Sequence, residues 1–203
     1  MIPLDIDALI SQAEARCQAA FARYEENELY HTRRVLDAFA QEKVGARHFA
    51  ATTGYGYDDI GRDTLERLYA ALFHTEAAIV RPQIASGTHA LSLCLFGVLL
   101  PGDELLSASG TPYDTLHSII GIDGCPAGSL RELGVRYDQA ELLPDGSIDL
   151  AAVRAKMKPS TKLVAVQRSC GYAMRRTLLP EDVRPLVDLM HTEYTGVDLT
   201  VDN

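Results

Sequence analysis

Apolar and polar residues first alternate with the three- to four-residue spacing of amphipathic helices. One apolar face runs over residues 6–24, and Asp5 or Asp7 is placed to cap its helix. A second amphipathic pattern over residues 28–44 predicts another helix. Glycines and threonines then interrupt the pattern over residues 47–61, which predicts a loop.

From residue 62 onward, short apolar runs alternate with helical patterns. The pattern predicts helices over 62–73, 88–100, 113–121, 149–157 and 180–190, and strands over 77–82, 103–109, 135–142, 161–169 and 197–201. Residues 88–100 are apolar nearly all round, so we expect that helix to be buried. Strands alternating with helices predict an α/β fold with a mostly parallel sheet flanked by helices. We place the boundary near Gly61, between a helical N-terminal arm with its loop (1–61) and an α/β domain (62–203).

Composition limits the partners of the chain. Its net charge of -9 argues against nucleic acid and membrane surfaces, because both require a basic face. The longest apolar stretch, ALSLCLFGVLL, is about half of a membrane span, and the first residues do not resemble a signal peptide. The four cysteines lie far apart, which favours free thiols in a reducing compartment. We therefore expect a cytoplasmic protein.

Several familiar motifs are missing or misleading. The stretch GYGYDDIG contains three glycines, but their spacing is wrong for a dinucleotide fingerprint and no strand precedes them. The sequence has no G-K-[ST] motif, no H-E-x-x-H motif and no cysteine pair, so it predicts neither a P-loop nor a metal site. Helix capping and the helix dipole sufficiently explain three acidic residues near this loop: Asp58, Asp59 and Asp63.

A stronger chemical signal lies where the predicted strand in RPQIASGTHAL gives way to an apolar helix. The helix opens with Ser86, Gly87 and Thr88. Glycine lets the backbone approach a ligand closely, and the free N–H groups and hydroxyls of this first turn would bind a phosphate. A plain helix cap is the alternative explanation of the same residues.

Two further residues follow predicted strands. Tyr113 begins the next helix, where its ring is placed to stack on a planar cofactor, although a buried aromatic with a satisfied hydroxyl is the alternative. Asp202 follows the last strand. Ligands bind at the carboxyl edge of such sheets. A phosphate turn, an aromatic ring and a carboxylate at that edge suit pyridoxal 5'-phosphate (PLP), whose ring nitrogen pairs with a carboxylate.

Longer stretches carry a family resemblance. In this order, ATTGYGYDDIGRDTLE, RPQIASGTHAL, GTPYDTLHSIIG, VQRSCGY and VDN resemble the methionine gamma-lyase-like family, also called aluminium resistance proteins. This family belongs to the fold type I PLP enzymes and is related to the cystathionine gamma-lyases. The resemblance runs from the first helix to the last residue. It implies part of the large domain of a carbon–sulfur lyase that acts on a sulfur-containing amino acid.

The resemblance implies roles for five residues. Ser86, Gly87 and Thr88 match the phosphate-binding turn of the family. Tyr113 matches the aromatic residue that stacks on the cofactor ring, and Asp202 matches the aspartate that faces the pyridine nitrogen. Tyr113 and Asp202 are therefore the implied catalytic residues of this chain.

A second group of residues implies an oligomer. Tyr55 or Tyr57, together with Arg62, falls in the loop that reaches the phosphate of the neighbouring subunit in related lyases. The resemblance thus implies a homodimer or a homotetramer. Cys170 departs from the family, because an arginine is common at its position.

The largest departure concerns the Schiff-base lysine, which follows the aspartate in the family. None of the four lysines of this chain falls in the matching place: Lys43, Lys156, Lys158 and Lys162. The C-terminal small domain of the family is also missing. We therefore expect a truncated member of the family that is inactive by itself.

Two other interpretations stay open. Nothing in the sequence identifies the substrate side chain, so a PLP enzyme of another reaction type, such as an aminotransferase, is an alternative. The other alternative is a non-catalytic α/β module, in which the residues at the strand ends only cap helices.

Overall fold

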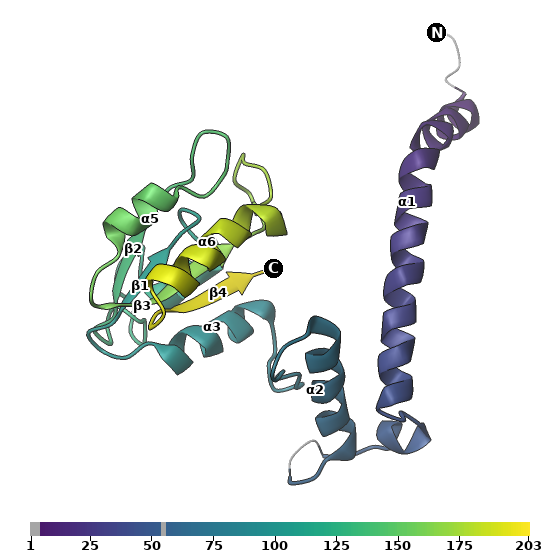
Figure 1. The fold of residues 1–203 in the computed structure, drawn as a ribbon, viewed down its shortest axis with the longest axis horizontal. Coiled ribbons are helices and arrows are strands. Elements are labelled where there is room, and N and C mark those ends of the chain that lie inside the picture. The colour runs from purple at the N-terminus through teal and green to yellow at the C-terminus, as the bar shows by residue number, and fades with distance from the viewer. Residues whose placement is uncertain (1–4, 54–55) are drawn as a thin grey trace. The chain divides into compact units, whose positions relative to one another are not determined.

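The computed structural model describes residues 5–53 and 56–203. Contacts between residues divide the chain into two compact units, Met1–Gln83 and Ile84–Asn203 (Figure 1). The predicted boundary near Gly61 falls inside a helix that packs within the first unit. No helix in the described part of the chain is both long enough and apolar enough to cross a membrane.

The N-terminal unit contains α1 (Ile6–Gln41), the short 3-10 helix η1 (Ala46–Phe49) and α2 (Ile60–Phe73). The two helices predicted over 6–24 and 28–44 form one continuous helix, because the residues between them include no glycine or proline. Asp5 caps α1 by accepting a hydrogen bond from the Ala8 N–H at 3.0 Å, as one of the two predicted alternatives requires.

Two side-chain contacts join α2 to the C-terminal part of α1. The Arg34 guanidinium donates to the Leu72 carbonyl, and Arg67 pairs with Glu42 at 2.8 Å. These contacts explain why α2 groups with the N-terminal helices and why the division between the units follows α2.

The strand predicted over 77–82 is wrong, because this segment is irregular in the structure. A strand requires a neighbouring strand to pair with its backbone. Here the Val80 N–H donates to a side-chain oxygen of Glu66, and Arg81 forms an ion pair with the same carboxylate at 2.7 Å. The extended segment is therefore tied to α2 and belongs to no sheet.

The C-terminal unit has a parallel four-stranded sheet, as the alternating pattern predicts. Its strands are β1 (Glu104–Ser107), β2 (Arg136–Gln139), β3 (Thr161–Gln167) and β4 (Asp198–Asp202), in the order β2-β1-β3-β4. Its helices are α3 (Gly87–Val98), α4 (Asp114–Ile120), α5 (Leu150–Lys156) and α6 (Pro180–Glu193). Each of these helices overlaps a predicted one, and Pro180 occupies the first turn of α6.

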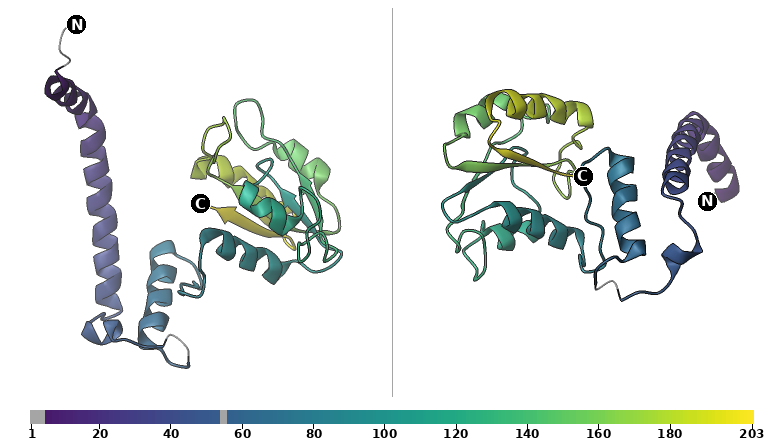
Figure 2. Two further views of the ribbon diagram at one scale, coloured as in Figure 1. Left: turned by 180° about the vertical axis from the view of Figure 1, so that it is seen from behind. Right: turned by 60° about the horizontal axis from the view of Figure 1, so that its bottom comes forward.

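Helices cover both faces of this sheet (Figures 1 and 2). Leu105 packs in one apolar core with residues of α3 and α4, and its neighbour Leu106 packs in the other core with residues of α5 and α6. This division follows from the alternation of side chains along a strand. The sheet between two helical layers confirms the predicted α/β class.

The expectation that residues 88–100 form a buried helix is correct for one face of the helix and wrong for the other. Leu95 of α3 is only 4% exposed, whereas Leu93 is 49% and Phe96 is 41% exposed. Within the described part of the chain, α3 packs on the sheet through one face. The apolar character of its other face therefore gave a misleading prediction of burial.

Candidate functional site

The carboxyl edge of the sheet is the place where its topology changes direction. The chain leaves β1 to form β2 on one side, and β3 and β4 lie on the other side. Such a switch leaves a crevice at the carboxyl ends of the strands, where ligands of α/β proteins bind. The N-terminus of α3 lies at the same edge as the end of β4 (Figures 1 and 2).

The first turn of α3 combines a helix cap with unused backbone donors. The Ser86 Oγ atom accepts a hydrogen bond from the His89 N–H at 3.1 Å, so Ser86 is the cap. The N–H groups of Gly87 and Thr88 have no hydrogen-bond acceptor among the described residues. A Cβ atom added at Gly87 would meet no atom within 4 Å. The turn therefore presents free donors and the positive end of a helix dipole to open space.

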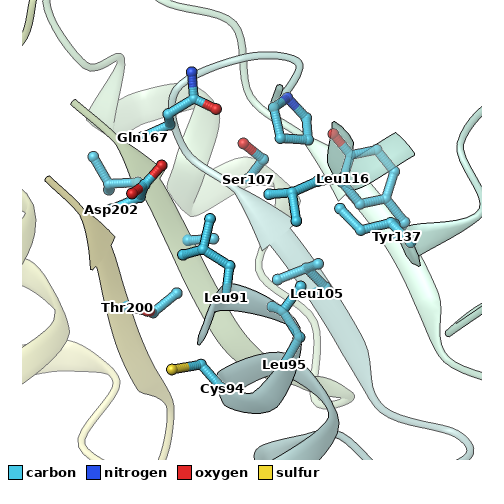
Figure 3. A pocket seen from close by; sticks show the side chains of 14 residues that line it. Leu91, Cys94, Leu95, Leu105, Ser107, Leu116, Tyr137, Gln167, Thr200 and Asp202 are labelled. Carbon is cyan, nitrogen blue, oxygen red and sulfur yellow. The ribbon is translucent and has the colours of Figure 1, made fainter. Parts of the chain in front are cut away.

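Asp202 and Gln167 lie side by side at the ends of β4 and β3, where they are paired in register. Figure 3 shows both polar side chains at the rim of a pocket whose interior is formed by leucines, including Leu91 and Leu105. The Asp202 carboxylate has no hydrogen-bond or ion-pair partner within the described ranges, and partial burial raises its pKa. A partly buried carboxylate without a partner favours a cationic ligand beside it.

Tyr113 reaches the same edge through its backbone. Its N–H donates to the Gln167 Oε1 atom at 2.8 Å, across 54 positions of the sequence. The Gln167 N–H in turn donates to Ser109 Oγ at 2.9 Å. The Tyr113 ring lies against the backbone of Gly171, where an added Cβ atom would overlap it. The sequence therefore places Tyr113 correctly at the start of α4, and the structure adds the residues that hold it.

The family model for methionine gamma-lyase matches residues 6–203. The chain belongs to the methionine gamma-lyase family. Protein YnbB of Bacillus subtilis is 49% identical over 171 residues, which are 84% of this chain and 41% of YnbB. The L-methionine gamma-lyase of Pseudomonas putida is 30% identical over 130 residues, which are 62% of this chain and 29% of that enzyme.

Solved structures of relatives have the same fold. A protein from Listeria innocua, for which a cystathionine beta-lyase role in aluminium resistance is suggested, has a TM-score of 0.93 and 46% identity. The match covers 98% of this chain and 49% of that one. The structure of metB from Corynebacterium glutamicum is more distant, with a TM-score of 0.56 and 22% identity over 79% of this chain and 40% of its own, and shows a likeness of fold alone. The chain thus has the fold of the large domain of fold type I PLP enzymes and spans less than half the length of these relatives.

The residues that the family resemblance assigns to a neighbouring subunit lie in the N-terminal unit. Arg62 is in the first turn of α2, where its guanidinium donates to the Gly56 carbonyl and pairs with Asp63, both at 2.8 Å. Tyr57 is fully exposed, and Tyr55 lies outside the described residues. Asp59 caps α2 through the Arg62 N–H, so its predicted capping role is confirmed. The role of this loop in a second subunit stays a prediction.

Three of the four lysines of this methionine gamma-lyase family member lie in the C-terminal unit, where ion pairs hold them away from the carboxyl edge of the sheet. Lys156 pairs with Asp138 at 2.7 Å, and Lys162 approaches Asp198 at 3.3 Å, beside the start of β4. Lys158 pairs with Glu104 at the start of β1, so these three lysines lie at or near the amino edge of the sheet. Lys43 follows α1 in the N-terminal unit. In the C-terminal unit, none of the lysines reaches the carboxyl edge.

Sequence reasoning missed Gln167, which contacts both Tyr113 and the strand that carries Asp202. One signal was available, because Gln167 is a polar residue at the end of an otherwise apolar stretch, LVAVQ. The neighbouring Arg168 turns to the other face of the sheet, where it donates to the Leu178 carbonyl and to Asn203. Cys170 is partly exposed, and its thiol donates to the Gly171 carbonyl.

Proposed function

We propose that this chain is the N-terminal part of a PLP-dependent carbon–sulfur lyase that acts on a sulfur-containing amino acid. The observation that carries the proposal is the unpartnered, partly buried Asp202 carboxylate at the same edge as the free N–H groups of Gly87 and Thr88. The Asp202 carboxylate needs a cation beside it, and the N–H groups of Gly87 and Thr88 need an anion. A protonated pyridine ring that bears a phosphate supplies both.

The residues of this edge fit the cofactor in specific roles. Gly87 and Thr88 would bind the phosphate through their backbone N–H groups, and the Ser86 and Thr88 hydroxyls would add further donors. Asp202 would stay ionised, accept a hydrogen bond from the protonated ring nitrogen and so keep the ring positively charged. Tyr113 would hold the plane of the ring. When bound, PLP supplies the electron sink that weakens the bonds at the α-carbon of an amino acid.

The substrate and the assembly are parts of the same proposal. The choice of a sulfur-containing amino acid rests on membership of the methionine gamma-lyase family. The assembly we propose is a homodimer or homotetramer, in which Arg62 and one of Tyr55 and Tyr57 reach the phosphate of the neighbouring subunit. The exposed side chain of Tyr57 supports a contact outside its own unit.

A binding experiment with pyridoxamine 5'-phosphate tests the cofactor site, because this probe cannot form an imine with a surface lysine. We expect the chain to bind it, and we expect Asp202→Ala to weaken binding about tenfold by removing the partner of the ring nitrogen. Thr88→Ala should weaken binding by a few-fold because it removes one phosphate donor. Fluorescence or calorimetric titration measures each dissociation constant.

Two variants control for the change of charge and of side chain. Asp188→Ala on α6 removes an exposed carboxylate, and Thr195→Ala removes an exposed hydroxyl after α6. Neither control should alter the affinity. Equal affinity in Asp202→Ala, Thr88→Ala and both controls would favour the non-catalytic module instead.

The purified 203-residue chain should lack lyase activity even with PLP present. The reason is that the three lysines of the C-terminal unit are held away from the carboxyl edge of its sheet, so none of these three is available there as the base or the covalent anchor. Assays for released thiol, ammonia and 2-oxo acid, with methionine, cystathionine and cysteine as substrates, measure this. Lys43 lies in the other unit, so it is replaced by alanine as well. Turnover that persists in Lys43→Ala would contradict the explanation that the chain is inactive because it has no lysine to act as the base.

A further inference from the structure

The peptide group that joins Pro112 to Tyr113 is held from both sides. Its carbonyl oxygen lies 3.0 Å from the His117 Nε2 atom. Its N–H donates to the Gln167 Oε1 atom at 2.8 Å. A peptide group is planar, so these two bonds together fix the orientation of the backbone from which the Tyr113 side chain projects.

His117 has a second oxygen neighbour on its other ring nitrogen. The His117 Nδ1 atom lies 2.6 Å from a carboxylate oxygen of Asp123. Neither the Asp123 carboxylate nor the Pro112 carbonyl has a proton to give, so both bonds form only when each ring nitrogen carries a proton. The geometry therefore requires the imidazolium form of His117.

The charges around His117 favour that form. Asp123 acts on it directly, and Asp114 lies nearby in the first turn of α4. The hydrogen bond to Asp123 is the main cause that raises the pKa of His117, and the bond to Pro112 and the charges of both aspartates raise it further. Partial burial of the ring acts in the opposite direction but does not outweigh these contacts.

We propose that His117, held as an imidazolium by Asp123, is a positioning residue that fixes the Pro112–Tyr113 peptide and with it the Tyr113 ring. The importance of this contact for catalysis rests on the proposed function, since Tyr113 is the residue expected against the cofactor ring. Gln167 holds the opposite side of the same peptide. His117 thus acts through Tyr113 and has no contact with a reacting atom.

The contact makes the position of Tyr113 depend on pH. In the folded chain the pKa of His117 lies above its ordinary value, so the imidazolium persists at a pH where a free histidine is neutral. As the pH rises through the folded pKa, His117 loses one proton. The shorter bond to Asp123 retains the remaining proton, and the bond to the Pro112 carbonyl is lost.

A fluorine probe at position 113 tests this dependence without any cofactor. We place 4-fluorophenylalanine there, because it has no titratable group of its own, and follow its ¹⁹F resonance against pH in the full chain. The resonance should shift with the same midpoint as the His117 ring, which ¹H–¹³C NMR monitors. His117→Gln should abolish this shift, and Asp123→Asn should move the midpoint to lower pH.

Asp123→Asn protects the test against misfolding, because the Asp123 side chain is 74% exposed and its replacement leaves the core unchanged. His191→Gln, which removes an exposed histidine from α6, is the matched control and should leave the shift intact. A ¹⁹F resonance that does not titrate, or that titrates equally in His117→Gln, would overturn the proposal.

The affinity for pyridoxamine 5'-phosphate separates this inference from the proposed function. If the wild-type chain binds the probe, His117→Gln should weaken binding several-fold at pH 6 and little at pH 9. If the wild-type chain does not bind it, the proposed cofactor site fails. The ¹⁹F titration still decides whether His117 positions residue 113.

Discussion

Replacing Gly171 by alanine is expected to destabilise the chain by about 3 kcal/mol. The backbone of Gly171 has a φ of +55°, a left-handed conformation that costs an alanine roughly 1 kcal/mol. In addition, the new methyl group would overlap the Tyr113 ring. Because His117 and Gln167 fix the peptide before Tyr113, the ring has little freedom to move away, and overpacking adds about 2 kcal/mol.

Urea denaturation of Gly171→Ala measures this loss, and two further variants divide it into its causes. Gly128→Ala is a matched control, since Gly128 has a φ of +82° but no atom within 4 Å of an added Cβ. It should cost about 1 kcal/mol, from backbone strain alone. In a Tyr113→Ala background, Gly171→Ala should also cost only about 1 kcal/mol, because the ring is gone. An undiminished cost in that background would show that the Tyr113 ring does not cause the loss.

Local patterns were sufficient for the sheet and for most helices, because each depends on neighbouring residues. The apolar run in β3 and the amphipathic pattern of α6 predict their own elements. The prediction failed for residues 77–82, whose extended sequence finds no strand to pair with. It also failed for the exposed face of α3, since a sequence pattern does not show what covers a helix.

The residues of the candidate site were also predictable only in part. Ser86, Tyr113 and Asp202 were predicted as candidates because each lies at an element boundary: Ser86 precedes α3, Tyr113 precedes α4, and Asp202 ends β4. The contacts that hold Tyr113 were not predictable, because Gln167 and Gly171 lie more than fifty residues further along the chain. Only the parallel pairing of β1 and β3 brings them together. The sequence therefore identified candidate residues of the proposed site, and the structure identified the contacts that hold one of them.

The second large effect is expected for Lys158→Met, which should destabilise the chain by about 3 kcal/mol. The Glu104 carboxylate is only 2% exposed, and its two oxygens accept from Lys158 Nζ at 2.7 Å and from Thr161 Oγ1 at 2.8 Å. Methionine fills a similar volume but leaves the buried charge without its cation. Because the Lys158 side chain is 48% exposed, water can reach the carboxylate in part, which keeps the loss at the lower end for a buried ion pair.

Thermal and urea unfolding of three matched variants test this interpretation. Lys162→Met makes the same substitution in an exposed pair, whose Nζ atom lies 3.3 Å from Asp198, and should cost less than about 0.5 kcal/mol. Adding Glu104→Gln to Lys158→Met should restore most of the lost stability, because it removes the unpaired charge but retains an acceptor for Thr161. Glu104→Gln alone should lower the free energy of unfolding less than Lys158→Met does, because water readily hydrates the exposed Lys158 ammonium that loses its partner. If the double variant were as unstable as Lys158→Met, lost packing of the lysine stem would be the cause instead of the unpaired carboxylate.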